Sequence, residues 1–242
     1  MSLSKNHIKR LKKYKLKKFR DADGIFIVEK WKNIDIFLKA GYKPVELYAS
    51  VPPSTGIPYH EISPKTLKEI SLLKNPYDAY AVFRKPRPPV FDPSQTTIFL
   101  YRIQDPGNLG TVIRSAAWFG VEQIVCSPGS VDFYHPKTLQ SAAGAWVNVR
   151  LFQMPFEELI RKTSLPVWAA DMNGENIFDL SFPEEFITVL GSEGSGLPED
   201  IRKKSGKIIS VPGSQKFATE SLNVSIATGI IIAEWFRSKS KQ

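Results

Sequence analysis

The sequence contains one cysteine, three histidines and no long apolar run, and each scarcity excludes a class of protein. Cys126 has no second cysteine with which to form an internal disulfide, so we expect a reducing cytoplasm. His7, His60 and His135 are far apart and have no metal-ligand spacing, so no metal site is predicted. No apolar stretch approaches the ~20 residues of a membrane span. The basic N-terminus has no apolar segment behind it, which argues against a signal peptide.

Common signatures of catalysis are also missing. The sequence has no G-x-S-x-G motif, which marks the nucleophilic serine of many hydrolases. It has neither a P-loop nor the glycine motif of dinucleotide-binding sites. Cys126 ends an apolar stretch, where a buried and unreactive thiol is more common than a nucleophile. A generic nucleotide-binding α/β enzyme is therefore poorly supported, although it stays open.

Acidic residues are absent from the first twenty positions, which hold nine cationic side chains. These nine account for the formal net charge of +9, because the rest of the chain holds 24 basic and 24 acidic residues. A basic arm on a balanced chain favours a nucleic-acid partner over a membrane surface; a solvated tail is the third possibility. The predicted RNA contacts are Lys9, Arg10, Lys12, Lys13, Lys17, Lys18 and Arg20.

Apolar spacing predicts two α/β units joined by a proline-rich linker. In the first unit, a helix over residues 5–19 places Ile8, Leu11, Leu16 and Phe19 in one stripe. Strands at 25–28, 45–49 and 79–83 and helices at 31–40 and 63–73 are then expected. Four prolines within residues 84–93 exclude a helix or a central strand there. We therefore divide the chain near Pro89, into residues 1–88 and 89–242.

The second unit alternates strands with helices, which predicts a mostly parallel sheet with helices on both faces. Strands are expected at 97–101, 123–126, 147–151, 166–170, 186–190 and 208–211, and helices at 109–119, 136–143, 155–163, 198–204 and 221–236. Three polar loops, at 104–110, 191–196 and 212–223, each follow a strand and precede a helix. Ligands in such sheets bind beyond the carboxyl ends of the strands, so these loops predict a site at one edge. Plain turns are the alternative.

The middle loop suits a close-fitting ligand. Its three glycines allow the backbone to approach a bound molecule, although a tight turn explains them equally well. Glu193 within it suits a cationic or neutral polar ligand rather than a phosphate. Arg114 is expected in the first turn of its helix, where a guanidinium opposes the helix dipole. That position predicts an anionic partner, such as Glu193 or a substrate phosphate.

The flanking loops carry Asn108, Ser221 and Asn223, for which two roles stay open. Asn108 can cap its helix, and Ser221 is the expected N-cap of the last helix, with Asn223 in its first turn. The same amides and hydroxyl can instead orient a ligand.

Together the three loops resemble the three motifs of the SpoU family of RNA ribose methyltransferases, in the knotted SPOUT superfamily. The matching segments are QDPGNLGTVIRSAAWFGV, ITVLGSEGSGLPED and ISVPGSQKFATESLNVSIATGI, within about residues 98–237. The segment FRDADGIFIVE is similar to the small substrate-binding domain that precedes the catalytic domain in many members. Lys30 stands where that stretch usually has glycine.

The resemblance implies methyl transfer from S-adenosylmethionine to a ribose 2′-hydroxyl of RNA, with ribosomal RNA favoured over tRNA. It also implies a trefoil-knotted C-terminal domain and a homodimer whose interface, formed by that domain, completes the site. By motif, it assigns catalytic positions to Asn108, Arg114, Glu193, Ser221 and Asn223. It assigns cofactor binding to Leu190, Gly191, Gly194, Val211 and Leu222.

The third loop departs from the family pattern. Gly213 follows Pro212 where methionine is usual, and the eight residues between Pro212 and Ser221 make the loop longer than usual. An RNA-binding relative without catalytic activity is therefore the main alternative.

Overall fold

The structure is a computed structural model that describes residues 3–53, 56–73, 75–76, 78–192, 194, 196–214 and 221–239. It divides into two compact units, one of Met1–Arg87 with Asp132–Val147 and one of Pro88–Val131 with Asn148–Gln242. The segment Asp132–Val147 was expected within the second unit, so the simple division near Pro89 needs correction. Packing explains the difference, because the rings of Tyr134 and Trp146 lie 5.1 and 5.8 Å from that of Phe26.

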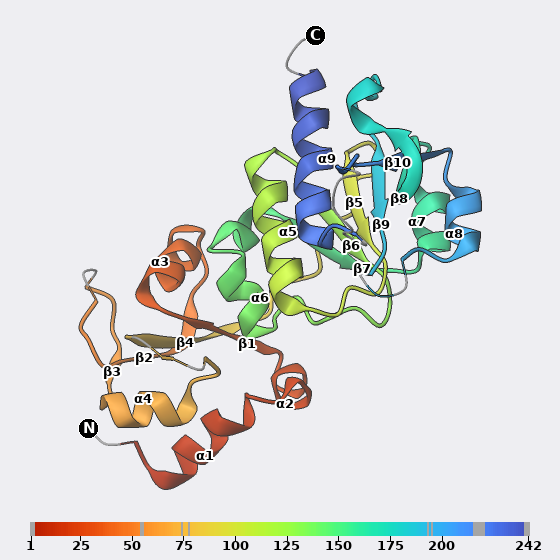
Figure 1. Ribbon diagram of the computed structural model, residues 1–242. Coiled ribbons are helices and arrows are strands. Elements are labelled where there is room, and N and C mark those ends of the chain that lie inside the picture. Colours follow the sequence, from red (N-terminus) through yellow and green to blue (C-terminus); the bar gives the residue numbers. More distant parts are fainter. Residues whose placement is uncertain are drawn as a thin grey trace. The chain divides into compact units, whose positions relative to one another are not determined.

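The first unit is built on a four-stranded sheet in the order β1-β4-β2-β3 (Figure 1). Its strands are β1 (Ile25–Glu29), β2 (Pro44–Ala49), β3 (His60–Glu61) and β4 (Ala79–Arg84). The pairing is antiparallel except between β2 and β3, and the two-residue β3 was not predicted. The helices are α1 (Lys5–Lys13), α2 (Lys17–Ala22), α3 (Trp31–Lys39), α4 (Pro64–Ile70) and α6 (Pro136–Ser141). A 3-10 turn, η1 (Ala145–Asn148), follows α6.

The basic arm forms two helices, not the single helix predicted over residues 5–19. The chain leaves α1 after Lys13 and starts α2 at Lys17, with Leu16 in the extended N-cap position. Leu16 is consequently 55% exposed and does not belong to the apolar stripe. Leu11 is fully buried in the core cluster of this unit, and Ile8 and Phe19 pack against it as expected.

The second unit contains a six-stranded, entirely parallel sheet in the order β10-β8-β9-β5-β6-β7, which confirms the predicted mostly parallel architecture. The strands are β5 (Thr97–Leu100), β6 (Gln123–Cys126), β7 (Arg150–Gln153), β8 (Val167–Asn176), β9 (Ile187–Leu190) and β10 (Lys207–Ser210). The helices are α5 (Pro106–Trp118), α7 (Phe156–Lys162), α8 (Glu199–Lys204) and α9 (Val224–Lys239), with a 3-10 turn, η2 (Ile177–Asp179).

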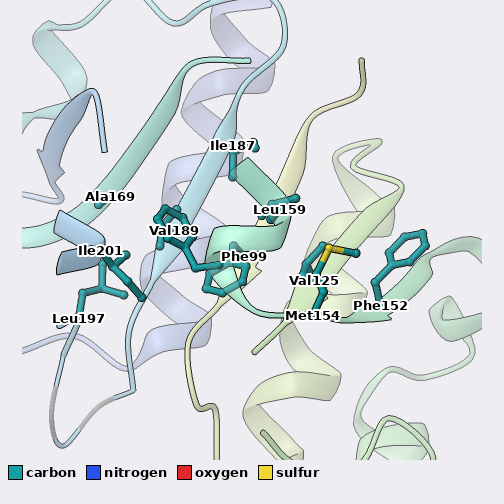
Figure 2. Packing of buried hydrophobic residues seen from close by; sticks show 11 residues of the cluster. Phe99, Val125, Phe152, Met154, Leu159, Ala169, Ile187, Val189, Leu197 and Ile201 are labelled. Atoms are coloured by element: carbon teal, nitrogen blue, oxygen red, sulfur yellow. The ribbon is translucent and has the colours of Figure 1, made fainter. Parts of the chain in front are cut away.

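Helices cover both faces of this sheet. On one face α7 and α8 contribute Leu159 and Ile201 to a buried cluster with strand residues such as Phe99 and Val189 (Figure 2). On the other face α5 and α9 pack against each other (Figure 1). No helix in the described part of the chain has the length and apolarity required to cross a bilayer.

The start of α5 differs from its prediction in a way that affects the site. The helix begins at Pro106 rather than near Leu109, because the Asp105 side chain accepts a hydrogen bond from Asn108 N at 2.9 Å. Asp105, and not Asn108, is therefore the N-cap. Arg114 lies in the interior of the helix, so the argument that it opposes the dipole in a first turn was wrong.

Two strands also differ from their predicted bounds. β7 starts at Arg150 rather than at 147, because η1 occupies the preceding residues. β8 continues from Val167 to Asn176, well beyond the expected end at 170. Its pairing with β10 shifts register between Ile208 and Ile209.

Candidate functional site

A cavity of about 850 Å³ lies at the carboxyl ends of β9 and β10, beside the middle of β8. Residues 190–192 and 209–214 line it from the ends of β9 and β10, residues 170–172 line it from within β8, and Ala227 and Ile231 of α9 close one side. Its volume is within the usual range for small-molecule sites. Five residues that sequence analysis assigned to the site line it together: Leu190, Gly191, Val211, Ser221 and Leu222.

The loop after β9 closes on itself, and Gly191 makes this possible. A Cβ at Gly191 would lie 2.3 Å from the carbonyl carbon of Gly196 and 2.7 Å from Leu197 N, closer than real Cβ atoms come. Gly196 N donates to Ser192 O at 2.9 Å, and Gly196 has a φ of +60°. Gly194 does not belong to the cavity lining, and a Cβ there would meet no atom within 4 Å. The glycines thus have separate roles, and only Gly191 is sterically required beside the cavity.

An amide pair joins the first and third motifs. Asn223 Nδ2 donates to Asn108 Oδ1 at 3.1 Å, across 115 residues of sequence. Asn223 Oδ1 accepts from Ser225 N at 3.0 Å, so Asn223 caps α9. Ser221 was predicted as this cap, but it lies three residues before the first helical residue, Val224. The predicted meeting of Asn108 and Asn223 is confirmed.

The two helices that carry this pair run side by side in the same direction. Beyond the pair, a Cβ at Gly229 would lie 3.8 Å from Ser115 Oγ, and the rings of Phe119 and Phe236 are 5.8 Å apart. The N-termini of α5 and α9 therefore meet at Asn108 and Asn223. Because helix N-termini carry partial positive charge, this end of the helix pair favours an anionic or electron-rich ligand group.

The structure does not bring Arg114 to this pair within one chain. Arg114 is exposed on α5, is not among the cavity-lining residues, and forms no ion pair with any described residue. Glu193, its expected partner, lies outside the described residues. The expected pocket of four residues is therefore observed only for its two asparagines.

The cavity wall formed by β8 was missed from the sequence. Asp171 and Met172 line it, and the Asp171 carboxylate accepts hydrogen bonds from Arg202 Nη1 and Asn173 N, both at 3.1 Å. A Cβ at Gly174 would lie 2.4 Å from the Ile209 backbone, so this glycine permits the close approach of β8 and β10. The available signal was that single glycine within the segment DMNGEN, which lies beyond the predicted end of the strand at 170.

Two other candidate chemistries find no support. Within the described ranges no three His, Cys, Asp or Glu side chains are grouped as metal ligands. Cys126 is fully buried, as predicted, and its burial raises the pKa of the thiol far above its ordinary value.

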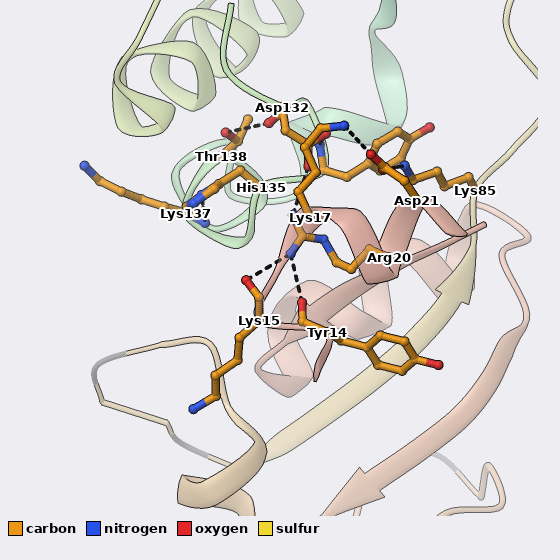
Figure 3. A network of polar contacts seen from close by, with 11 residues as sticks. Tyr14, Lys15, Lys17, Arg20, Asp21, Lys85, Asp132, His135, Lys137 and Thr138 are labelled. Carbon is orange, nitrogen blue, oxygen red and sulfur yellow. Dashed lines mark hydrogen bonds and ion pairs between the residues drawn. The ribbon is translucent and has the colours of Figure 1, made fainter. Parts of the chain in front are cut away.

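In the first unit, Arg20 has a structural role rather than the RNA-binding role predicted for it. Its side chain is 2% exposed and forms an ion pair of 2.9 Å with Asp132 (Figure 3). Arg20 Nη1 also donates to the Tyr14 carbonyl at 2.8 Å. Because Asp132 opens the segment that joins this unit from later in the chain, Arg20 fixes that segment to the basic arm.

The other cations of the arm fall into two groups. Three are ion-paired: Arg10 with Glu46, Lys12 with Glu69, and Lys17 with Asp21. Among the described residues the remaining lysines form no ion pair; these are Lys5, Lys9, Lys13, Lys15 and Lys18. All five are exposed, and Lys13 and Lys18 lie 5.6 and 5.0 Å from the centre of the Phe19 ring. This second group is the part of the arm that is free to meet a polyanion.

Comparison with known families places the chain. Residues 95–233 match the model of the SpoU rRNA Methylase family, and residues 5–81 match the MRM3-like substrate binding domain. The first match covers more than half of the chain, which therefore belongs to the SpoU rRNA methylase family. The resemblance to this family that the three loops indicated is confirmed.

Individual relatives agree with this assignment. The 23S rRNA (guanosine(2553)-2′-O)-methyltransferase RlmP of Bacillus subtilis is 26% identical over 96% of both chains. Ribosomal RNA small subunit methyltransferase G 2 of Syntrophobacter fumaroxidans is 37% identical over 59% of this chain. An uncharacterized tRNA/rRNA methyltransferase of Synechocystis is 34% identical over 57%. The matches span 27% and 51% of the lengths of the latter two relatives.

Solved structures show the same architecture over the whole chain. An AdoMet-bound rRNA methyltransferase from Sinorhizobium meliloti is 25% identical and superposes with a TM-score of 0.86, covering 98% of this chain and 97% of that one. A TrmH-family protein from Porphyromonas gingivalis is 32% identical with a TM-score of 0.84, covering 97% and 98%.

Proposed function

We propose that the chain is an RNA 2′-O-ribose methyltransferase that uses S-adenosylmethionine. One observation carries the proposal: a cavity of small-molecule size at the carboxyl edge of the sheet is lined by the second and third family motifs, and the first motif is joined to them through the Asn108–Asn223 pair. RlmP, which aligns over nearly the full length, is a 23S rRNA 2′-O-methyltransferase, and this supports ribosomal RNA as the substrate class.

The cavity fits S-adenosylmethionine in size and in the character of its walls. Leu190, Leu222 and Ile231 provide apolar surface, and residues 191–192 and 211–213 provide backbone groups for polar contacts. Asp171 adds a carboxylate to the wall, which suits a cationic ligand. When bound, the cofactor supplies a sulfonium methyl group, to which the ribose 2′-oxygen bonds as the carbon–sulfur bond breaks.

The protein's task in this reaction is alignment and charge stabilisation. The Asn108–Asn223 pair lies at the joined helix N-termini, where its amides can orient the ribose. The guanidinium of Arg114 offers hydrogen-bond donors and no acceptor, so it cannot accept the proton of the hydroxyl group. We assign to Arg114 the binding of an RNA phosphate beside the target ribose, and a phosphate oxygen or water takes the proton.

In a homodimer, Arg114 of one copy can contribute to the site of the other copy. Trp118 lies one helical turn beyond Arg114 on the same face of α5 and is 82% exposed. On the adjacent α9, Ile226 and Phe236 are 50% and 46% exposed. Large apolar side chains exposed on two adjacent helices, one of them a tryptophan, are typical of a protein interface. We infer that two copies associate through α5 and α9, so that Arg114 of one copy serves the cavity of the other.

The first unit fits RNA capture. Two of its unpaired lysines, Lys13 and Lys18, lie over the Phe19 ring, and the matched family is a substrate-binding domain. We infer a cytoplasmic enzyme acting on ribosomal RNA, and the C-terminal trefoil knot implied by the resemblance stays a prediction.

Comparing cells with and without the protein tests this function. Mapping 2′-O-methyl groups in total RNA should show one ribosomal position that loses its methyl group on deletion. Wild-type protein should restore it, and the Arg114→Ala variant should not. Identical methylation maps in both strains would contradict the proposal.

The altered third loop favours one competing function, RNA binding without catalysis. Titration calorimetry with S-adenosylmethionine separates the two, because a non-catalytic relative has no need to bind it. Micromolar binding supports the enzyme, and absence of binding supports the alternative.

A further inference from the structure

Arg102 adopts a backbone conformation that residues other than glycine rarely adopt. Its φ of +49° lies in the left-handed region, where the Cβ of an L-residue crowds the following carbonyl group. The side chain is exposed and makes no hydrogen bond or ion pair with any described residue. Glycine would relieve this strain, so the arginine side chain itself needs an explanation.

A network of hydrogen bonds holds Arg102 in this conformation. Arg102 N donates to Ser127 Oγ at 2.8 Å, and Gln104 Nε2 donates to the carbonyls of Arg102 and Gly129 at 3.0 and 2.8 Å. Val131 N donates to Ile103 O at 2.8 Å, and Ile103 is buried. These bonds join the loops that follow β5 and β6. The side chain of Arg102 therefore projects from a fixed support.

The support belongs to the same edge of the sheet as the cavity. Tyr101 N, in the residue before Arg102, donates at 2.8 Å to the carbonyl of Leu190, which lines the cavity. Asp105, three residues after Arg102, caps the helix that carries Asn108. Arg102 thus stands in the connection between a cavity wall and the amide pair.

We propose that Arg102 binds a phosphate group of the RNA backbone and holds the substrate strand at this edge of the sheet. This inference rests on the proposed function, since it assigns a substrate contact to the same site. A guanidinium presents paired N–H donors that match two phosphate oxygens. A guanidinium carried by a fixed backbone has less conformational entropy to lose on binding than one carried by a mobile loop.

Three variants test the role. Arg102→Gly removes the side chain and the backbone strain together. Arg102→Lys keeps the positive charge but lacks the paired N–H donors of a guanidinium. Arg161→Ala removes an exposed arginine from α7 and serves as the control. Binding to in vitro transcribed 23S rRNA is measured by filter retention at several salt concentrations. S-adenosylmethionine affinity and Tm are measured alongside.

We expect Arg102→Gly to raise the RNA Kd by about tenfold. The slope of log K against log salt should fall by about one, as expected for the loss of one phosphate contact. Its Tm should stay equal or rise by a few degrees, and its cofactor affinity should change by less than about twofold. Arg102→Lys should recover part of the RNA affinity, and Arg161→Ala should match the wild type.

RNA binding by Arg102→Gly equal to the wild type would overturn the inference, as would an equal loss in Arg161→Ala. The proposed function is tested separately by methyl transfer in the wild type. If the wild type binds RNA without methylating it, the function fails, while the ratio of Kd values still decides the role of Arg102.

Discussion

At the scale of single residues, the site depends on where a side chain is absent as much as on where one is present. Gly191 lies against the backbone of Gly196, so the loop beside the cavity exists in this form only without a Cβ at that position. Gly194, three residues on, has open space around it. The two glycines of one loop therefore offer a matched comparison.

We expect Gly191→Ala to displace the loop and to weaken S-adenosylmethionine binding by at least about tenfold, since the contact is with rigid backbone. Gly194→Ala should leave cofactor affinity within about twofold. Titration calorimetry measures both. Equal affinities for the two variants would show that the loop does not form the cofactor site.

The pairing of Asn108 with Asn223 could be predicted from the sequence because both follow strands of one parallel sheet, whose carboxyl ends share an edge. The cap at Asp105 could also have been found, since an aspartate followed by proline is a common helix start. The burial of Arg20 could not, because its partner Asp132 is 112 residues away and belongs to a segment of unexpected placement. In the arm sequence, a buried arginine and an exposed one look alike.

At the scale of secondary-structure elements, α1 and α2 carry two kinds of cation, for which we propose the separate roles of packing and RNA capture. The cations that pair with Glu46, Glu69 and Asp21 contribute mainly to docking, whereas the unpaired lysines keep their charge available. Lys12 and Lys17 belong to the ion-paired cations, and Lys9 and Lys13 belong to the unpaired lysines.

Replacing Lys9 and Lys13 with glutamine should lower RNA affinity about tenfold at low salt and reduce the slope of log K against log salt by about one to two. Replacing Lys12 and Lys17 removes the same formal charge but should have a clearly smaller effect. Filter binding over a salt series measures both double variants. A larger loss from the Lys12 and Lys17 pair would contradict the division.

The end of β1 contains a buried carboxylate. Glu29 is 7% exposed and accepts hydrogen bonds from Ser71 Oγ and from Leu72 N, which ties β1 to the residues after α4. Burial raises the pKa of Glu29, and these hydrogen bonds offset the rise only in part. The folded state therefore binds the carboxyl proton of Glu29 more tightly than the unfolded state does. The free energy of unfolding falls as pH rises from the ordinary pKa of a glutamate to the raised pKa of Glu29.

Glu29→Gln should remove this loss, because the amide keeps an acceptor for Leu72 N without a charge. Its free energy of unfolding relative to wild type should increase between pH 4 and pH 7 by on the order of 1 kcal/mol. Urea unfolding at several pH values measures the difference. Parallel stability profiles for the two proteins would contradict the assignment.

At the scale of the whole molecule, the fold of the second unit could be predicted from the sequence more fully than that of the first. The parallel sheet and its loops follow from local patterns, and apart from the second half of β8 they were predicted with small errors at the ends of elements. The first unit recruits Asp132–Val147 from between β6 and β7, a choice made by aromatic packing between distant segments. Periodicity carries no information about such long-range partners.

The proposed homodimer predicts a specific role for Trp118. Trp118→Glu should weaken self-association by at least about tenfold, because a central tryptophan contributes strongly to an interface. Val90→Glu is the control, since Val90 is 83% exposed in the same unit but lies outside α5 and α9. Light scattering coupled to size exclusion should show a monomer for the first variant and a dimer for the second. Dimers of equal stability would exclude this face.

The most direct test of the whole account is methyl transfer by the purified protein. Unmodified 23S and 16S rRNA transcripts are incubated with S-adenosylmethionine that carries a tritiated methyl group, and the RNA is then hydrolysed with alkali. A ribose 2′-O-methyl group blocks cleavage at its own nucleotide, so we predict tritium in an alkali-resistant dinucleotide from one transcript. Tritium in mononucleotides, which indicates base methylation, or no transfer to either transcript would contradict the account.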